Sequence, residues 1–283
     1  MAERRLAVLG SPIAHSRSPQ LHLAAYRVLG LDWSYERIEV ASGGLAAFLD
    51  GLDDRWRGLS LTMPLKREVV PMLAEREALV ETAGGANTVL LDGGRLSGFN
   101  TDVDGLVAAY AEHGIRRVDR ALVLGGGATA ASVLVALRRL DAEEAVIAVR
   151  EPARAAELAS LAEGIGLRLE LRRLDEALPQ DVDAVVRSLP GDARVDPARL
   201  LAARDAGASL LDVAYEPWPG ELGEAWLAAG LPVVRGLEML LHQALLQVRI
   251  FAGGAPGAAL EREAEVLAAM RDAVGLGSAG MGG

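Results

Sequence analysis

The stretch from Arg120 to Ala130 reads RALVLGGGATA and joins a short apolar strand to a glycine-rich turn. From Gly125 onward the turn has the spacing Gly-x-Gly-x-x-Ala, with a helix expected from about 131 to 140 and a second strand from 145 to 149. Such a turn lets a pyrophosphate approach the backbone at the helix N-terminus. The pattern predicts a Rossmann-type dinucleotide site. The alternative is a turn that only packs a helix against a sheet.

The residues that follow the second strand bear on the choice of nucleotide. Arg150, and Arg154 one turn later, favour NADP because two guanidinium groups can clamp a 2′-phosphate. Glu151 favours NAD, because an acid near this place accepts a hydrogen bond from the ribose 2′-hydroxyl. We therefore expect NADP as the cofactor, with NAD as the alternative.

Lys66 is the only lysine among the 29 lysine and arginine residues of the chain. A chain that otherwise uses arginine for positive charge is expected to keep an amine where the chemistry requires one. A guanidinium stays protonated at any working pH, whereas the protonation of an ammonium group can be tuned by its surroundings. Lys66 is therefore a candidate for proton transfer, and the alternative is an ordinary surface lysine.

Uncommon polar residues gather in a few short stretches of this Ala-, Leu- and Arg-rich chain. The two asparagines are Asn87, in GGANT, and Asn100, in GFNTD. Four of the five threonines also fall in motif-like stretches, namely Thr62, Thr88, Thr101 and Thr129. This concentration suggests a polar site. The alternative is that these side chains only cap backbone groups in turns.

The first hundred residues predict a β-α-β-α-β order, with strands near 6–9, 33–40 and 58–62. Ser18 is the expected N-cap of the first helix, with Pro19 at its first position. Because the carboxyl ends of parallel strands meet at one edge of a sheet, the loop that carries Ser16 is expected to meet Thr62 and Lys66 there.

Two further patterns complete the coarse prediction. The stretch Asp92-Gly93-Gly94 between apolar runs predicts a hairpin that brings Asn87 and Asn100 to the same end. Later helices are expected at 42–52, 103–113, 236–251 and 258–274, and later strands near 167–171, 184–187 and 210–213.

Bulk composition limits the class of protein. A length of 283 residues suits one large domain or two ordinary ones, and a hydrophobic content of 51% is typical of a well-packed globular chain. A net charge of −10 argues against a nucleic-acid partner. The absence of cysteine excludes disulfides and thiolate catalysis, and the four histidines lack metal-ligand spacing. With neither a signal core nor a membrane span in the sequence, we expect a cytoplasmic protein.

These motifs, in this order, resemble the shikimate dehydrogenase family from Leu6 to about Val274. The resemblance is carried by GSPIAHSRSP at 10–19, LTMPLK at 61–66, ANT at 86–88, NTD at 100–102, the glycine turn, and MLLHQ at 239–243. It implies an α/β protein of two domains. Residues 1–102 and 236–275 would form a mostly parallel substrate domain, 103–235 a Rossmann-type nucleotide-binding domain, and 276–283 a disordered tail.

The resemblance also implies an activity and its residues. The activity is the reversible, NADP-dependent reduction of 3-dehydroshikimate to shikimate in aromatic amino-acid biosynthesis, by a monomer or homodimer. Proton transfer falls to Lys66 with Asp102 beside it. Contacts to substrate are implied for Ser16, Ser18, Thr62, Asn87, Tyr215 and Gln243. The expected cofactor contacts are Gly125, Gly126, Gly127, Ala128, Thr129, Arg150, Arg154, Val213, Gly236 and Met239, and no metal is expected.

Three departures from the family pattern leave alternatives open. Val149-Arg150-Glu151 stands where the family usually has Asn-Arg-Thr, Ser60 replaces a usual asparagine, and the usual threonine is missing near Pro219-Gly220. We expect these changes to alter the cofactor rim more than the substrate pocket. The alternatives are a quinate or aminoshikimate dehydrogenase, with NAD as a possible cofactor, and a non-catalytic binding or regulatory relative.

Overall fold

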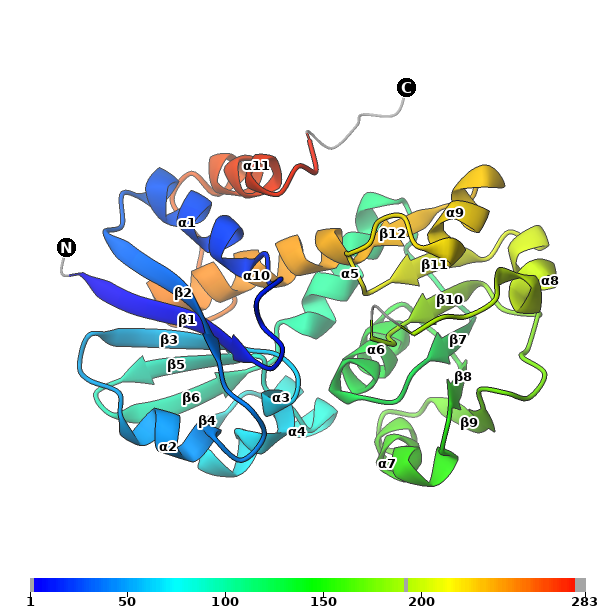
Figure 1. Ribbon diagram of the computed structural model, residues 1–283, viewed down its shortest axis with the longest axis horizontal. Helices are drawn as coiled ribbons and strands as arrows, with labels where there is room; N and C mark the ends of the chain where they lie inside the picture. The colour runs from blue at the N-terminus through cyan, green and yellow to red at the C-terminus, as the bar shows by residue number, and fades with distance from the viewer. Residues whose placement is uncertain (1–2, 191–192, 278–283) are drawn as a thin grey trace. The chain divides into compact units, whose positions relative to one another are not determined.

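The chain forms two compact units, each with its own six-stranded sheet (Figure 1). A computed structural model describes residues 3–190 and 193–277, apart from the side chain of Arg154. The first unit contains the residues up to Gly105 and those from Leu240 onward, and the second contains Leu106–Met239. The tail expected to be disordered, 276–283, lies outside the described residues from 278 onward. Within the described ranges, no helix is both long and apolar enough to cross a membrane.

The sheet of the first unit has the order β2-β1-β3-β5-β6-β4. β1 pairs in parallel with β2 and β3, as the predicted β-α-β-α-β order requires, whereas β5 pairs antiparallel with β3 and β6. The strands are β1 Arg4–Gly10, β2 Trp33–Glu39, β3 Trp56–Leu61, β4 Glu75–Arg76, β5 Thr88–Asp92 and β6 Arg95–Phe99. The helices are α1 Ser18–Leu29, α2 Leu45–Asp50, α3 Leu65–Glu68, the 3₁₀ turn η1 Val70–Met72, α4 Ala78–Ala83 and α11 Glu263–Ala273.

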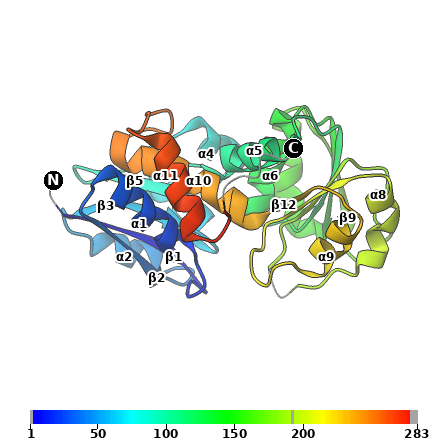
Figure 2. The same ribbon diagram turned by 90° about the horizontal axis from the view of Figure 1, so that it is seen from above.

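Alternate residues of the central strands face two helical layers, as the period of a strand requires. Leu59 and Leu61 of β3 pack in a core with residues of α2, α3 and α4. On the opposite face, a Cβ built on Gly58 would lie 2.2 Å from the Phe251 ring, so α10 (Gly236–Gly253) packs closely on this strand. Figures 1 and 2 show α1, α10 and α11 together on that face, with α11 beside α1.

The predicted hairpin is confirmed. β5 and β6 pair in antiparallel register from Thr88 opposite Phe99 to Asp92 opposite Arg95. Gly93 and Gly94 make the turn at φ values of 56° and 81°, which favour glycine. At the other end of the hairpin the main-chain N–H of Asn87 donates to the carbonyl of Phe99 at 3.1 Å, so the Asn87 and Asn100 motifs lie side by side.

The sheet of the second unit is parallel throughout and has the order β9-β8-β7-β10-β11-β12. In chain order within the unit this is 3-2-1-4-5-6, the doubly wound order whose ligand site lies where the order reverses. The strands are β7 Arg120–Leu124, β8 Glu144–Val149, β9 Arg168–Arg173, β10 Ala184–Arg187, β11 Ser209–Asp212 and β12 Val233–Arg235. The helices are α5 Asp102–Glu112, α6 Ala128–Arg139, η2 Pro152–Ala155, α7 Ala156–Gly164, η3 Pro197–Leu200, α8 Leu201–Asp205 and α9 Glu221–Ala228.

Helices cover both faces of this second sheet. Figure 1 shows α6 and α7 on one side, and α8 and α9 on the other. Trp226 of α9 is fully buried in the core that α8, η3 and the strands share, and its indole N–H donates to the Ala208 carbonyl at 2.7 Å. A buried ion pair between Arg187 and Asp212, 3.0 Å apart, joins the ends of β10 and β11. Burial raises the pKa of the Asp212 carboxyl against the opposing effect of Arg187.

Candidate active site

The single lysine lies beside a carboxylate within the first unit. Lys66 is in α3, directly after β3, and its Nζ donates to Oδ2 of Asp102 at 2.6 Å. The two side chains are 13% and 5% exposed. Asp102 is the first residue of α5, where the helix dipole favours a negative charge. A partly buried ion pair of this kind offers an amine that can exchange a proton while a fixed carboxylate holds it in place.

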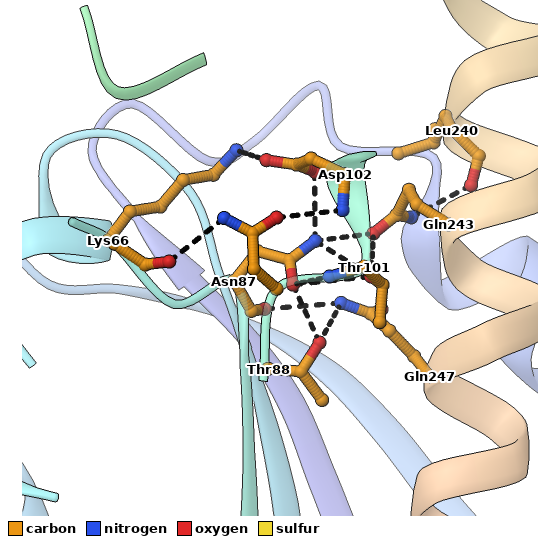
Figure 3. A network of polar contacts seen from close by, with 10 residues as sticks. Lys66, Asn87, Thr88, Thr101, Asp102, Leu240, Gln243 and Gln247 are labelled. Atoms are coloured by element: carbon orange, nitrogen blue, oxygen red, sulfur yellow. Dashed lines mark hydrogen bonds and ion pairs between the residues drawn. The ribbon is translucent and has the colours of Figure 1, made fainter. Parts of the chain in front are cut away.

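Asn87 links this ion pair to the rest of the site (Figure 3). Its Nδ2 donates to Oδ1 of Asp102 at 2.8 Å, to Oγ1 of Thr101 at 2.8 Å and to Oε1 of Gln243 at 3.2 Å. Its Oδ1 accepts the main-chain N–H of Thr101 at 2.9 Å. Because a main-chain N–H can only donate, this bond fixes which end of the amide faces the carboxylate.

Gln243 comes from α10, more than 130 residues away in the sequence, yet it reaches the same cluster. The glutamine is 5% exposed, and its Nε2 donates to the Leu240 carbonyl at 2.8 Å. A Cβ built on Gly105 of α5 would lie 2.8 Å from Cβ and 2.9 Å from N of Gln243. Only glycine at 105 lets the two helices approach closely enough for Gln243 to contact Asn87.

Asn100 caps main-chain groups in a turn, which is the alternative role that the sequence left open for both asparagines. Its side chain bridges main-chain groups, donating to the Gly85 carbonyl at 2.9 Å and accepting from the Asp102 N–H at 3.1 Å. It therefore shapes the turn that presents Asp102, whereas Asn87 contacts the carboxylate itself.

The serine loop meets the end of β3 at one sheet edge, as the parallel strand order predicts. The Ser11 N–H donates to the Met63 carbonyl at 3.0 Å, and the Thr62 N–H donates to the Leu9 carbonyl at 2.9 Å. Ser16 and Ser18, further along this loop, are buried. The prediction that Ser18 caps α1 is wrong, because the cap position is Arg17 and the Ser18 N–H instead donates to Oγ of Ser16 at 3.4 Å.

In the second unit, the glycine turn has the conformation that a Rossmann site requires. Gly125, at the end of β7, has φ of 114°, and a Cβ there would lie 2.7 Å from Oγ of Ser188 at the end of β10. The turn therefore lies where the strand order reverses. The helix α6 starts at Ala128 and includes Thr129. Its N-cap residue, Gly127, has no side chain that could cap the free N–H groups of the first turn. These groups can hold a pyrophosphate.

Arg150 follows β8 and lines a cavity of about 440 Å³ with Arg173, Leu174, Asp175 and Arg199. A cavity that contains several guanidinium groups fits a 2′-phosphate. Glu151, next to Arg150, is exposed. Arg154 belongs to η2, and its side chain lies outside the part of the chain that the structure describes.

The remaining candidates follow β11 and β12. Gly236 begins α10 directly after β12, and a Cβ there would lie 2.2 Å from the Val213 carbonyl, so these two residues are in close contact. Met239, one turn into α10, is 5% exposed. Tyr215 lies in the loop after β11 and is partly buried.

Sequence reasoning missed Gln247. Its amide donates to the Asn87 carbonyl at 3.1 Å, and Ser60 donates to its Oε1 at 2.8 Å. Thr101, whose motif suggested a polar site, accepts from Nδ2 of Asn87. Gln247 lies one helical turn after Gln243, and this spacing is the signal that could have found it. Ser60 is one of the three changes expected to alter the cofactor rim more than the substrate pocket, yet it is buried in the first unit, where its hydroxyl donates to Gln247 and accepts from Tyr35.

Comparison with known proteins identifies the family. Strand order and glycine turn define an α/β protein that contains a Rossmann-type unit. The chain belongs to the shikimate dehydrogenase family. A family profile described as "Shikimate dehydrogenase substrate binding domain" matches residues 8–89. The shikimate dehydrogenase (NADP(+)) of Thermus thermophilus is 37% identical over 262 residues, which cover 89% of this chain and 94% of that protein.

Solved structures agree with this assignment. The chain resembles shikimate 5-dehydrogenase of Thermus thermophilus in complex with NADP(H) and shikimate, with a TM-score of 0.78 and 32% identity over 95% of this chain and 99% of that one. It also resembles quinate dehydrogenase of Corynebacterium glutamicum in complex with NAD, with a TM-score of 0.82 and 27% identity over 95% and 99% of the two chains.

Proposed function

We propose that the protein is an NADP-dependent shikimate dehydrogenase, which reversibly reduces 3-dehydroshikimate to shikimate. The observation that carries this proposal is the partly buried Lys66–Asp102 pair, with Nζ 2.6 Å from Oδ2 and the Asn87 amide hydrogen-bonded to the other carboxylate oxygen. Family membership supports it, because relatives that match this chain over most of their length are named shikimate dehydrogenase (NADP(+)).

The residues of the second unit suit the cofactor. Gly125–Gly127 and the N-terminus of α6 would hold the pyrophosphate, and Arg150 in its basic cavity would hold the 2′-phosphate. When bound, the nicotinamide supplies or accepts a hydride at the carbinol carbon. Val213, Gly236 and Met239 would form part of the cofactor surface, with Tyr215 near the substrate.

Proton transfer is the task of the first unit. In the reductive direction the Lys66 ammonium gives a proton to the ketone oxygen, which becomes the hydroxyl. The neutral amine stays hydrogen-bonded to Asp102 and regains a proton from solvent. In the oxidative direction the amine takes the hydroxyl proton. A positioned acid or base of this kind contributes a factor of roughly 10²–10⁴ to the rate.

The substrate is a polyhydroxylated carboxylate, and the first unit offers matching groups. Ser16 and Ser18, at the start of α1, suit the carboxylate. Asn87, Gln243 and Thr62 suit the hydroxyls, because amides and hydroxyls both donate and accept. A pocket that pairs each hydroxyl strongly rejects analogues with an unmatched one.

A steady-state assay tests the proposal. The purified protein is given shikimate or quinate with NADP⁺ or NAD⁺, and the absorbance of the reduced nicotinamide is followed. We expect the highest kcat/KM for shikimate with NADP⁺. The absence of turnover with either substrate and either cofactor would contradict the proposal and favour a non-catalytic relative.

Quinate oxidation with NAD is the second candidate. It is supported by Glu151, which follows β8 next to Arg150, and by the similarity to a quinate dehydrogenase that binds NAD. A higher kcat/KM for quinate with NAD⁺ in the same assay would replace the first candidate.

The setting of the enzyme is part of the proposal. We infer a cytoplasmic protein that acts as a monomer or homodimer and binds no nucleic acid. The net charge of −10 supports the last point, because it repels a polyanion. Light scattering and fractionation of cells would test the first two.

A further inference from the structure

A buried polar cluster extends from Asn87 away from Lys66, within the first unit. At its centre is Gln247 of α10, which is 1% exposed. Around it lie groups from α1, β2, β3 and β5, all buried: His22, Tyr26, Tyr35, Ser60 and Thr88. The proton-transfer chemistry proposed above uses none of these side chains, so their hydrogen bonds call for another explanation.

Main-chain groups fix the orientation of both amides in the cluster. Nε2 of Gln247 donates to the main-chain carbonyl of Asn87 at 3.1 Å, so Oε1 of Gln247 faces the opposite way, toward Ser60 and His22. Oδ1 of Asn87 accepts the Thr101 N–H, so Nδ2 of Asn87 faces Asp102. Neither amide can be reversed without placing two donors or two acceptors against each other.

The hydroxyl directions follow from the amides. Oγ1 of Thr88 accepts from Nε2 of Gln247 at 2.9 Å, so its own hydrogen goes to Oδ1 of Asn87, also at 2.9 Å (Figure 3). Oγ of Ser60 donates to Oε1 of Gln247 at 2.8 Å and therefore accepts from the Tyr35 hydroxyl at 2.6 Å.

His22 begins this series of hydrogen bonds, and its partners allow only one tautomer of the imidazole. Oε1 of Gln247 can only accept, so Nε2 of His22, 3.1 Å away, carries the hydrogen. Nδ1 of His22 then accepts from the Tyr26 hydroxyl at 3.2 Å. The imidazole stacks on the Tyr35 ring with centroids 4.0 Å apart, and burial lowers the pKa of His22 to about 3. The ring is therefore neutral at any working pH.

Every hydrogen bond along this path is donated toward Asp102. The direction runs from His22 through Gln247 and Thr88 to Asn87, and from Asn87 to the carboxylate. Bonds aligned in this way polarise one another in a low-dielectric interior. This series of hydrogen bonds thus holds the Asn87 amide with its N–H groups toward Asp102, where the proposed substrate hydroxyls would also lie.

We propose that Gln247 is a positioning residue for the reaction, which acts through Thr88 and Asn87 on the Asp102 carboxylate that holds Lys66. This inference rests on the proposed function. Within the described residues, the hydrogen bonds of Gln247 go to His22, Ser60, Asn87 and Thr88 and not to Lys66 or Asp102. Its influence therefore passes through the Thr88 hydroxyl and the Asn87 main chain.

Thr88→Val is the sharpest test, because valine keeps the branched shape and the strand preference while it removes the hydroxyl. We expect kcat/KM for shikimate to fall about tenfold, the effect of one lost hydrogen bond. KM for NADP⁺ should stay within about twofold, and Thr88→Ser should restore the activity. Gln247→Met should lower kcat/KM at least as much, since it removes the amide that donates to the Thr88 hydroxyl and to the Asn87 carbonyl.

Thr82→Val is the matched control, because Thr82 is exposed on α4 and donates only locally, to the Ala78 carbonyl at 2.9 Å. It should leave the kinetics unchanged. A crystal structure of Thr88→Val should show the Asn87 amide displaced, with its Nδ2 further from Oδ1 of Asp102 than the 2.8 Å of the wild type. Unchanged kcat/KM in Thr88→Val and Gln247→Met, with only a lower melting temperature, would mean that the cluster is merely structural and would overturn the proposal. A wild-type protein inactive with shikimate would instead overturn the proposed function.

Discussion

Asn87 and Lys66 share the Asp102 carboxylate, one oxygen each. Nδ2 of Asn87 donates to Oδ1 at 2.8 Å, and Nζ of Lys66 donates to Oδ2 at 2.6 Å. With both oxygens engaged, the carboxylate cannot rotate without losing a buried hydrogen bond. The lysine nitrogen is therefore held at a fixed point of the first unit.

Lys66→Arg tests whether this fixed nitrogen exchanges a proton. Arginine keeps the positive charge next to Asp102 but stays protonated at any working pH. We expect kcat to fall at least about 100-fold. The dissociation constant for shikimate, measured by calorimetry, should rise only modestly. Arg67→Lys, on the adjacent exposed residue, is the control and should leave kcat unchanged. An active Lys66→Arg enzyme would refute the proton-transfer role.

Arg150→Ala tests the basic cavity. Loss of a charge-assisted hydrogen bond to the 2′-phosphate should raise KM for NADP⁺ about tenfold or more and leave KM for shikimate unchanged. Arg168→Ala is the control. Arg168 lies at the end of β9 opposite to Arg173, which lines the cavity, and it pairs with Glu144 at 2.7 Å. Equal effects of both changes would show that only overall charge matters.

Glu151→Thr tests the mixed signal for nucleotide choice. Removing a carboxylate beside a bound phosphate relieves a repulsion of about 1 kcal/mol. The ratio of kcat/KM for NADP⁺ over NAD⁺ should therefore rise about fivefold. An unchanged ratio in steady-state assays would remove Glu151 from the account of cofactor preference.

Gly105→Ala tests the close approach of α5 and α10. The new methyl group would lie 2.8 Å from Cβ of Gln243, so the helices must separate. We expect a loss of about 1–3 kcal/mol in the free energy of unfolding and a raised KM for shikimate. Gly164→Ala, at the end of α7 where nothing lies within 4 Å of the added Cβ, should not lower the free energy of unfolding and should leave KM unchanged.

His22 should make the protein sensitive to acid. Its pKa is lowered to about 3 in the folded chain by burial, against 6.5 for the unfolded group. Between these values the unfolded chain binds one more proton, so stability is fully present above pH 6.5 and falls progressively as the pH falls toward 3. Urea unfolding at pH 7, 6 and 5 measures this. His22→Gln should lack this one-proton slope, and an identical slope in the variant would show that His22 is not its source.

The glycine turn and the strand–helix alternation were sufficient to predict the α/β class. They also placed the glycine turn at Gly125 between a strand and a helix, because the turn needs a backbone that only glycine adopts readily. The order of the strands themselves depends on which edges pair across more than 60 residues, as β7 does with β10. No local pattern in a single sequence encodes that pairing.

Within the site, the sequence predicted Lys66 beside Asp102 because the family motifs carry both. It missed Gln247, since the one-turn spacing after Gln243 shows only that both lie on one helix face, and the buried partners of Gln247 come from β3 and β5 through the fold. The expected helix 258–274 begins late, at Glu263, because Arg262 takes a left-handed conformation with φ of 56°. Likewise α2 begins at Leu45, since Gly43 has φ of 82°.

The first unit is built from two segments, one that ends at Gly105 and one that begins at Leu240, and the whole second unit, Leu106–Met239, lies between them in the sequence. On the ribosome, the second unit can be complete before Gln243, Gln247 and α11 have been synthesised. Until then, the apolar face of β1 and β3 lacks its α10 cover and is a natural target for chaperones. We therefore expect the nucleotide-binding half of the nascent chain to fold first, and truncation before Leu240 to spare it.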